Sequence, residues 1–208
     1  MTLRPLLLLA SLLFFLAPRL AQATVMVAPT DDELVSGAQV IGMAVVQRLE
    51  VVIAPSGQVM THAELKIERG VRGADDGDFV SMDYPGGTLP NGVVSSVPGS
   101  PNLKVGDRVF AYLRPGRTGA LLPIGLRFGV LDVHRGKDGR FRANRRLDGL
   151  TLVDKTGAAT PTTRYILHDV VIDRLVEDTQ ARMRKLRIDA GAPARNTSRG
   201  LSIPKVTP

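Results

Sequence analysis

In the segment DYPGGTLPNGVVSSVPGSPNLKVGDRVFAYLR, residues 83–114, two strand-like pieces flank a long connection rich in glycine and proline. In residues 79–84, Val80, Met82 and Tyr84 alternate with Phe79, Ser81 and Asp83, which predicts a strand buried mainly on one face. Pro85 then removes a backbone donor, and Gly86 and Gly87 permit positive φ, so we expect regular pairing to stop there. Residues 108–114 are apolar on both faces, which is typical of a central strand.

Further β-segments lie on both sides of this stretch. A long β-rich segment at 38–53 is followed by a Pro-Ser-Gly turn and a return strand at 59–68, and Gly42 is a candidate bulge or barrel bend. After the central strand, shorter strands are expected at 120–124, 127–135, 141–144 and 150–154. The pattern predicts a mainly β domain over residues 24–155.

Two helices are expected outside the strands. Thr30 followed by Glu33 forms a capping-box pattern, which predicts a short helix ending near Ser36. Residues 156–166 are rich in Gly, Ala, Thr and Pro and are expected to be a linker. An apolar stripe of helical period then predicts a helix over 167–188, and the polar residues 189–208 predict a disordered tail.

The first 23 residues have the features of a secretory signal peptide. Arg4 precedes an apolar run at 6–17, and Ala21-Gln22-Ala23 matches a small-x-small cleavage site. We therefore expect a secreted or periplasmic protein. The chain has no cysteine, which excludes disulfides, a lipid anchor on cysteine, thiolate metal sites and cysteine nucleophiles.

Short sequence words between residues 30 and 135 carry a resemblance. The order T.DELV..A.VI (30–41), PGG (85–87), VPGSP (97–101) and GDRVFAYL (106–113) resembles a group of uncharacterised secreted bacterial proteins. More distantly, it is similar to the netrin/TIMP-like version of the OB-fold. The resemblance implies a small OB-like barrel with a short N-terminal helix and a C-terminal helix. Netrin-like domains usually carry disulfides and often an N-terminal cysteine, and this chain departs from that pattern.

The resemblance also implies a contact surface. An extracytoplasmic module of this kind would dock a secreted protease, or another envelope protein, through the arm at 24–28 and the loop at 85–101. Since no N-terminal cysteine is present, docking is expected rather than zinc-chelating inhibition. The predicted protein-contact residues are Thr24, Val25, Met26, Pro85, Gly86 and Gly87.

Motifs for catalysis, metals and cofactors do not stand out. His62 with Glu64, and Asp132 with His134, would share strand faces and could meet at a metal only if their strands adjoin. Exposed polar strand positions explain the same residues, and the aspartates at 75–78 lack the ligand spacing of a calcium loop. Neither a GxSxG nor a phosphate-loop pattern occurs. We therefore predict a non-catalytic module without a metal or cofactor.

A run of basic residues between 135 and 146 suggests an alternative function. OB-type barrels bind polymers, and a cluster of cations would attract phosphates or acidic polysaccharide. The run lies on a predicted hairpin, where a solvated turn is the simpler interpretation, and it contains one aromatic residue, Phe141. The candidate residues for binding an anionic envelope polymer are Arg135, Lys137, Arg140, Arg142, Arg145 and Arg146.

Overall fold

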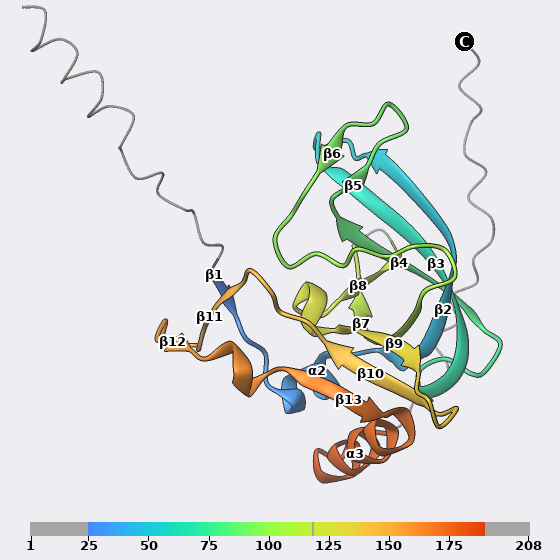
Figure 1. The fold of residues 1–208 in the computed structure, drawn as a ribbon, viewed down its shortest axis with the longest axis vertical. Helices are drawn as coiled ribbons and strands as arrows, with labels where there is room; N and C mark the ends of the chain where they lie inside the picture. Colours follow the sequence, from blue (N-terminus) through green and yellow to red (C-terminus); the bar gives the residue numbers. More distant parts are fainter. Residues whose placement is uncertain (1–24, 118, 190–208) are drawn as a thin grey trace, which may run out of the picture.

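A computed structural model describes residues 25–117 and 119–189 (Figure 1). An eight-stranded sheet dominates it, with strands in the order β13-β10-β9-β7-β2-β3-β4-β8. These strands span β2 (Val40–Ile53), β3 (Val59–Arg72), β4 (Phe79–Pro85), β7 (Arg108–Pro115), β8 (Leu121–Pro123), β9 (Val130–Arg135), β10 (Phe141–Arg145) and β13 (Leu167–Val171).

Five of these strands close into a barrel. The chain returns through β8, which pairs in parallel with β4 at Met82 and Leu121 and antiparallel with β7. Because β7 also pairs along β2, the ring β2-β3-β4-β8-β7 is closed. The expected mainly β, OB-like barrel is therefore confirmed.

Alternate side chains of strand β7 point into two different hydrophobic cores. Its odd positions, such as Val109 and Leu113, are buried inside the barrel with Leu65 and Met82. Its even positions, Phe110 and Tyr112, point to the opposite side and join an outer core. A strand with both faces covered is apolar throughout, so the expectation of a central strand at 108–114 is confirmed.

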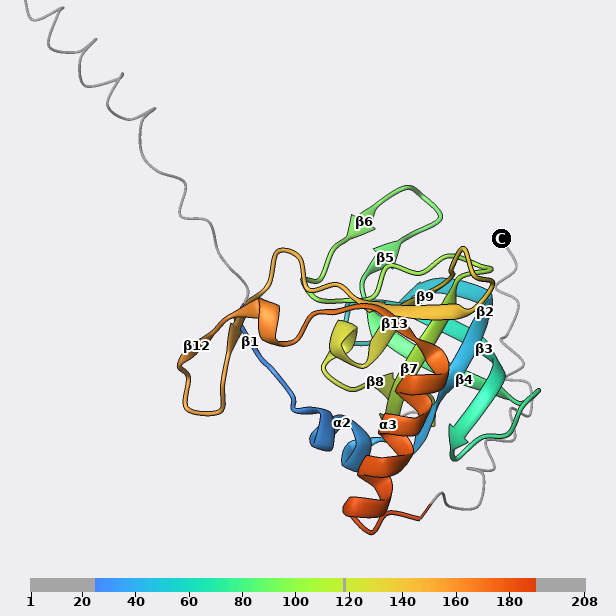
Figure 2. The same cartoon turned by 60° about the horizontal axis from the view of Figure 1, so that its bottom comes forward.

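Two helices cover the outer core. Helix α2 (Asp31–Gly37) begins with the expected capping box, in which the Thr30 side chain accepts from the Glu33 N–H and the Glu33 carboxylate accepts from the Thr30 N–H. Helix α3 (Ile172–Lys185) lies across the outer face of the sheet, next to α2 (Figure 2). None of the helices in the described residues is long and apolar enough to cross a membrane.

The predicted helix over 167–188 is wrong at its beginning. Residues 167–171 form strand β13, which pairs with β10, and the helix starts only at Ile172. An apolar run of this length fits either a strand or a helix turn, and pairing to the free edge of β10 decides between them. The C-terminal elements therefore extend the main sheet, and the fold does not end at residue 155.

A small second sheet holds the remaining short strands. Strand β1 (Val25–Val27) pairs in parallel with β11 (Thr151–Val153), and β11 pairs with β12 (Ala159–Thr160). The predicted linker at 156–166 is thus structured, since it contains β12 and a 3-10 turn, η2 (Thr162–Arg164). A two-stranded hairpin, β5 (Gly87–Thr88) with β6 (Val94–Ser95), rises from the end of β4.

Two further expectations meet different outcomes. The segment predicted as one strand over 127–135 begins with a 3-10 turn, η1 (Leu126–Phe128), because Gly125 and Leu126 adopt positive φ there. The signal peptide at 1–23, Thr24 and most of the predicted tail lie outside the described residues.

Candidate functional site

The N-terminal arm forms an edge strand with exposed valines. Val25 and Val27 are 60% and 54% exposed, whereas Met26 between them is half-buried. A Cβ atom on Gly99 would lie 2.5 Å from the Met26 Cε atom, so Met26 packs directly on the 85–101 loop. The two halves of the predicted contact surface therefore meet at Met26 and Gly99.

The three loop residues predicted to make contacts lie where the β5–β6 hairpin joins the barrel. Gly86 is buried and Pro85 and Gly87 are half-buried. The Gly86 carbonyl accepts a 2.6 Å hydrogen bond from the Thr61 hydroxyl, and its N–H donates to the Val59 carbonyl. These residues anchor the β5–β6 hairpin to the barrel, because buried backbone groups need partners. The buried Gly86 is therefore unsuited to a contact surface, whereas the contact role of the half-buried Pro85 and Gly87 stays a prediction.

Exposed apolar surface lies instead at the hairpin tip. Val93 and Val94 are 54% and 67% exposed. They follow a tight turn in which the Gly92 N–H donates to the Leu89 carbonyl. Ile53, at the end of β2, is 62% exposed. In Figure 1 the hairpin stands at the same end of the molecule as the β2–β3 turn. Two valines directly after the turn sequence Pro-Asn-Gly were a signal that could have indicated this tip.

The basic run does not form one surface. Arg135, Lys137, Arg140 and Arg146 are exposed, whereas Arg145 is only 3% exposed. Arg142 is partly buried and pairs with Asp138 and Asp169, each at 2.8 Å. Successive strand residues point to opposite faces, so Arg142 and Arg145, three positions apart on β10, do not share a face of the sheet. The prediction that all six cations bind one polymer is wrong for Arg145.

The histidines predicted from strand faces remain apart. His62 lies on β3 and His134 on β9, and β7 and β2 lie between these strands in the sheet. His62 pairs with Asp83 at 2.6 Å, and His134 pairs with Asp169 at 3.2 Å. Within residues 25–117 and 119–189, no three His, Asp or Glu side chains gather as a metal site would require.

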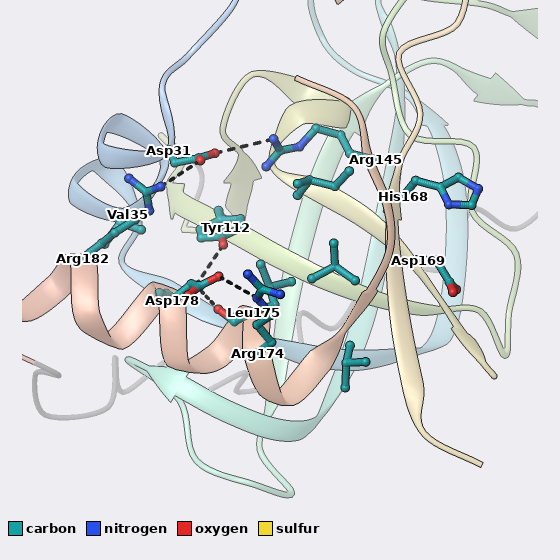
Figure 3. Close-up of a pocket in the computed structure, with 14 residues that line it drawn as sticks. Asp31, Val35, Tyr112, Arg145, His168, Asp169, Arg174, Leu175, Asp178 and Arg182 are labelled. Carbon is teal, nitrogen blue, oxygen red and sulfur yellow. Dashed lines mark hydrogen bonds and ion pairs between the residues drawn. The ribbon is translucent and has the colours of Figure 1, made fainter. Parts of the chain in front are cut away.

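A cavity of about 480 Å³ lies between α2, β10, β13 and α3 (Figure 3). Arg145 from β10 and Tyr112 from β7 line it together with Thr179 and Arg182 from α3. The Tyr112 hydroxyl lies 3.1 Å from the Thr179 hydroxyl, and burial raises the Tyr112 pKa. No local sequence pattern indicates this cavity, because β10, β13 and α3 come together only in the folded protein.

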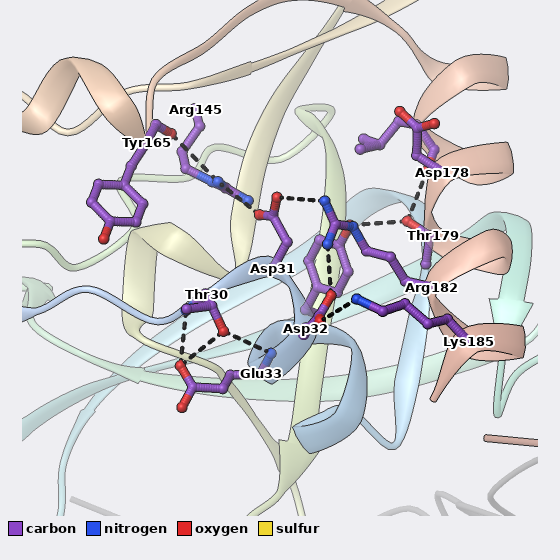
Figure 4. A network of polar contacts seen from close by, with 12 residues as sticks. Thr30, Asp31, Asp32, Glu33, Arg145, Tyr165, Asp178, Thr179, Arg182 and Lys185 are labelled. Atoms are coloured by element: carbon purple, nitrogen blue, oxygen red, sulfur yellow. Dashed lines mark hydrogen bonds and ion pairs between the residues drawn. The ribbon is translucent and has the colours of Figure 1, made fainter. Parts of the chain in front are cut away.

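An ion-pair network borders the cavity and joins the two helices (Figure 4). Arg182 donates to Asp32 at 2.6 Å and to Asp31 at 3.2 Å, and Lys185 donates to Asp32 at 3.3 Å. The hydrogen bonds from Arg182 and Lys185 lower the Asp32 pKa. Arg145 approaches the same group of carboxylates, with its Nη1 atom 3.6 Å from Asp31.

No known family matches this chain, and a search of curated proteins found no match.

Proposed function

We propose that this chain is a non-catalytic extracytoplasmic module that binds another protein, with a secreted protease as the partner class. The observation that carries the proposal is the edge strand β1, which presents Val25 and Val27 to solvent while Met26 fixes it to the 85–101 loop. β1 pairs only with β11 among the described residues, so its outer edge is open. An open strand edge is a template for an added strand of a partner.

Two further features support this proposal. The predicted signal cleavage would leave Thr24, which precedes Val25 in the sequence, as the new N-terminus. The hairpin tip adds Val93 and Val94 as a second exposed apolar site on the connection that leads to Gly99. Isolated exposed valines are common on protein surfaces, and their grouping on a strand edge and a hairpin tip favours binding.

The test is capture of proteolytic activity by the immobilised protein. The captured fraction from the producing cell's culture supernatant and periplasm is assayed on a gelatin zymogram. We expect a bound protease, and we expect Val25→Asp with Val27→Asp to reduce its capture at least tenfold, because charges on an open strand edge oppose pairing. The matched control is Val105→Asp, at a valine 64% exposed on the turn before β7.

Several outcomes would decide against this proposal. An absence of bound proteolytic activity, or an equal loss with the Val105→Asp control, would refute it. A second candidate function, binding of an anionic polymer, depends on the exposed cations of the basic run, of which Lys137 and Arg140 lie at the β9–β10 turn and Arg135 and Arg146 lie beside it. Retention on heparin that survives the valine substitutions and is removed by Lys137→Gln with Arg140→Gln would favour that candidate.

A further inference from the structure

The guanidinium of Arg145 is buried with fewer partners than its donors require. A guanidinium carries five N–H donors, and that of Arg145 makes one hydrogen bond, a 3.4 Å contact from Nη1 to the Tyr165 carbonyl. Its Nε atom is buried and has no partner among the described residues. Its nearest carboxylate, on Asp31, lies at 3.6 Å and is shared with Arg182. Buried donors without acceptors are costly, so an additional acceptor would stabilise this site.

The charges around this arginine also leave room for one anion. Arg145 and Arg182, which line the cavity, share the carboxylate of Asp31, and Arg182 and Lys185 share that of Asp32. These three cations therefore have two carboxylates between them, although Lys185 is 71% exposed and lies outside the cavity lining. The remaining charged residues of the cavity have their own partners. Asp169 pairs with Arg142 and His134, and Arg174 lies 4.0 Å from Asp178. In Figure 3, Asp169 and His168 project away from the other side chains.

The rest of the cavity wall is largely apolar. The side chains of Val35, Leu167, Val170, Val171 and Leu175 line it from α2, β13 and α3. A cavity of about 480 Å³ is large enough for a small organic molecule. Its occupant therefore needs an apolar body as well as a single negative charge, which inorganic phosphate does not provide.

We propose that this cavity binds a small organic carboxylate, with the carboxylate group on the Arg145 guanidinium and the apolar body along β13 and α3. Arginine suits this role because its planar guanidinium matches the geometry of a carboxylate and keeps its charge when buried. The site is separate from the exposed β1 edge, so a ligand here is independent of the protein-binding proposal.

The test uses sodium hexanoate as the probe and NMR of arginine side chains as the measurement. We expect hexanoate to shift the Arg145 Nε–Hε signal and the amide signals of β13 and α3 in a saturable way. Hexanol carries the same body without the charge, and phosphate and chloride carry charge without the body. None of the three is expected to reproduce the shifts at equal concentration.

The neighbouring arginine provides a matched control. Arg145→Gln and Arg146→Gln make the same change of charge, at side chains that are 3% and 64% exposed. We expect hexanoate to bind Arg145→Gln at least tenfold more weakly and Arg146→Gln as tightly as the wild type, because the lost hydrogen bonds are charge-assisted. If Arg145→Gln does not fold, the wild-type titration alone decides.

The proposal fails if hexanoate leaves the Arg145 signal unchanged, or if hexanol shifts it equally. It also fails if phosphate binds in preference to hexanoate, or if Arg146→Gln weakens binding as much as Arg145→Gln.

Discussion

At the scale of single residues, Glu33 shows how a local sequence pattern gains a long-range contact. Its carboxylate completes the capping box at Thr30 and also pairs with Lys155, from the turn between β11 and β12. The hydrogen bond from Lys155, followed by those of the capping box, lowers the Glu33 pKa from its usual 4.5 to about 2. One side chain therefore joins the small second sheet to helix α2.

This pKa shift predicts a pH dependence of stability. Because the folded-state pKa is depressed, the stabilisation by ionised Glu33 is complete above pH 4.5 and is lost as the pH falls toward 2. Glu33→Gln keeps a side chain that can cap the helix but removes the charge. We expect this variant to be less stable than the wild type at pH 6, with a difference that shrinks steadily as the pH falls from 4.5 to 2.

The measurement is urea unfolding of both proteins at several pH values, followed by circular dichroism. Glu177→Gln removes an exposed carboxylate of α3 and serves as the control for a change in net charge. The effect is expected to be modest, because the pair is partly exposed and screened by solvent. A wild-type-minus-variant difference that is constant from pH 6 to pH 2 would contradict the linkage.

Some properties of single residues could be predicted from the sequence, and others could not. The capping box could be predicted because Thr30 and Glu33 are three residues apart and interact within one helical turn. The burial of Arg145 could not, because Arg145 and Arg146 have identical side chains and adjacent positions. Pairing of β10 with β9 and β13 decides which of them faces the helices. Charge alone carries no information about that choice.

At the scale of elements, Gly42 lies at one of the register irregularities between the long strands β2 and β3. The register between β2 and β3 shifts between Ile41 and Gly42, which confirms the expected bulge. A Cβ atom at position 42 would lie only 2.7 Å from the backbone carbonyl oxygen of Arg69. A close backbone contact of this kind permits glycine alone, since a backbone atom cannot move aside as a side chain can.

Substitution of this glycine tests the bulge. We expect Gly42→Ala to reduce the free energy of unfolding by about 1–3 kcal/mol, because the added methyl group overpacks a closed barrel. Gly37→Ala is the control, since its Cβ atom would meet only the flexible end of Ile124 at 3.3 Å. Urea unfolding measures both, and equal effects of the two substitutions would show that the bulge imposes no steric requirement.

Element boundaries were predictable where side-chain periodicity was regular. The strands expected from β-rich composition at 38–53 and from alternation at 59–68 and 108–114 are present as β2, β3 and β7. The predicted helix start at residue 167 was wrong, because residues 167–171 pair with the edge of β10 and form strand β13. Such pairing joins residues far apart in the sequence, as between Ala143 and Val170, and no local pattern records it.

At the scale of the whole molecule, two hydrophobic cores share the same strands. Strand β2 contributes Val40 and Ala44 to the barrel core and Ile41 and Met43 to the outer core, and β7 is divided in the same way. Neither core can lose its strands while the other keeps them. The parallel contact between β4 and β8 closes the barrel. The outer core depends on the barrel because β2 and β7 belong to both. The sequence predicted the apolar strands but not that closure, which depends on a pairing between distant segments.

This sharing predicts that the described part of the chain unfolds as one cooperative unit. Tyr84 is buried in the barrel core and Tyr112 in the outer core, and the chain has three tyrosines and no tryptophan. A protein with Tyr112→Phe and Tyr165→Phe reports on the barrel core by fluorescence, and one with Tyr84→Phe and Tyr165→Phe reports on the outer core. In each protein we expect the fluorescence midpoint in urea to match the circular dichroism midpoint, as two-state unfolding requires. A lower fluorescence midpoint in the protein that retains Tyr112 would mean that α2 and α3 detach from an intact barrel, so the shared strands would not couple the two cores.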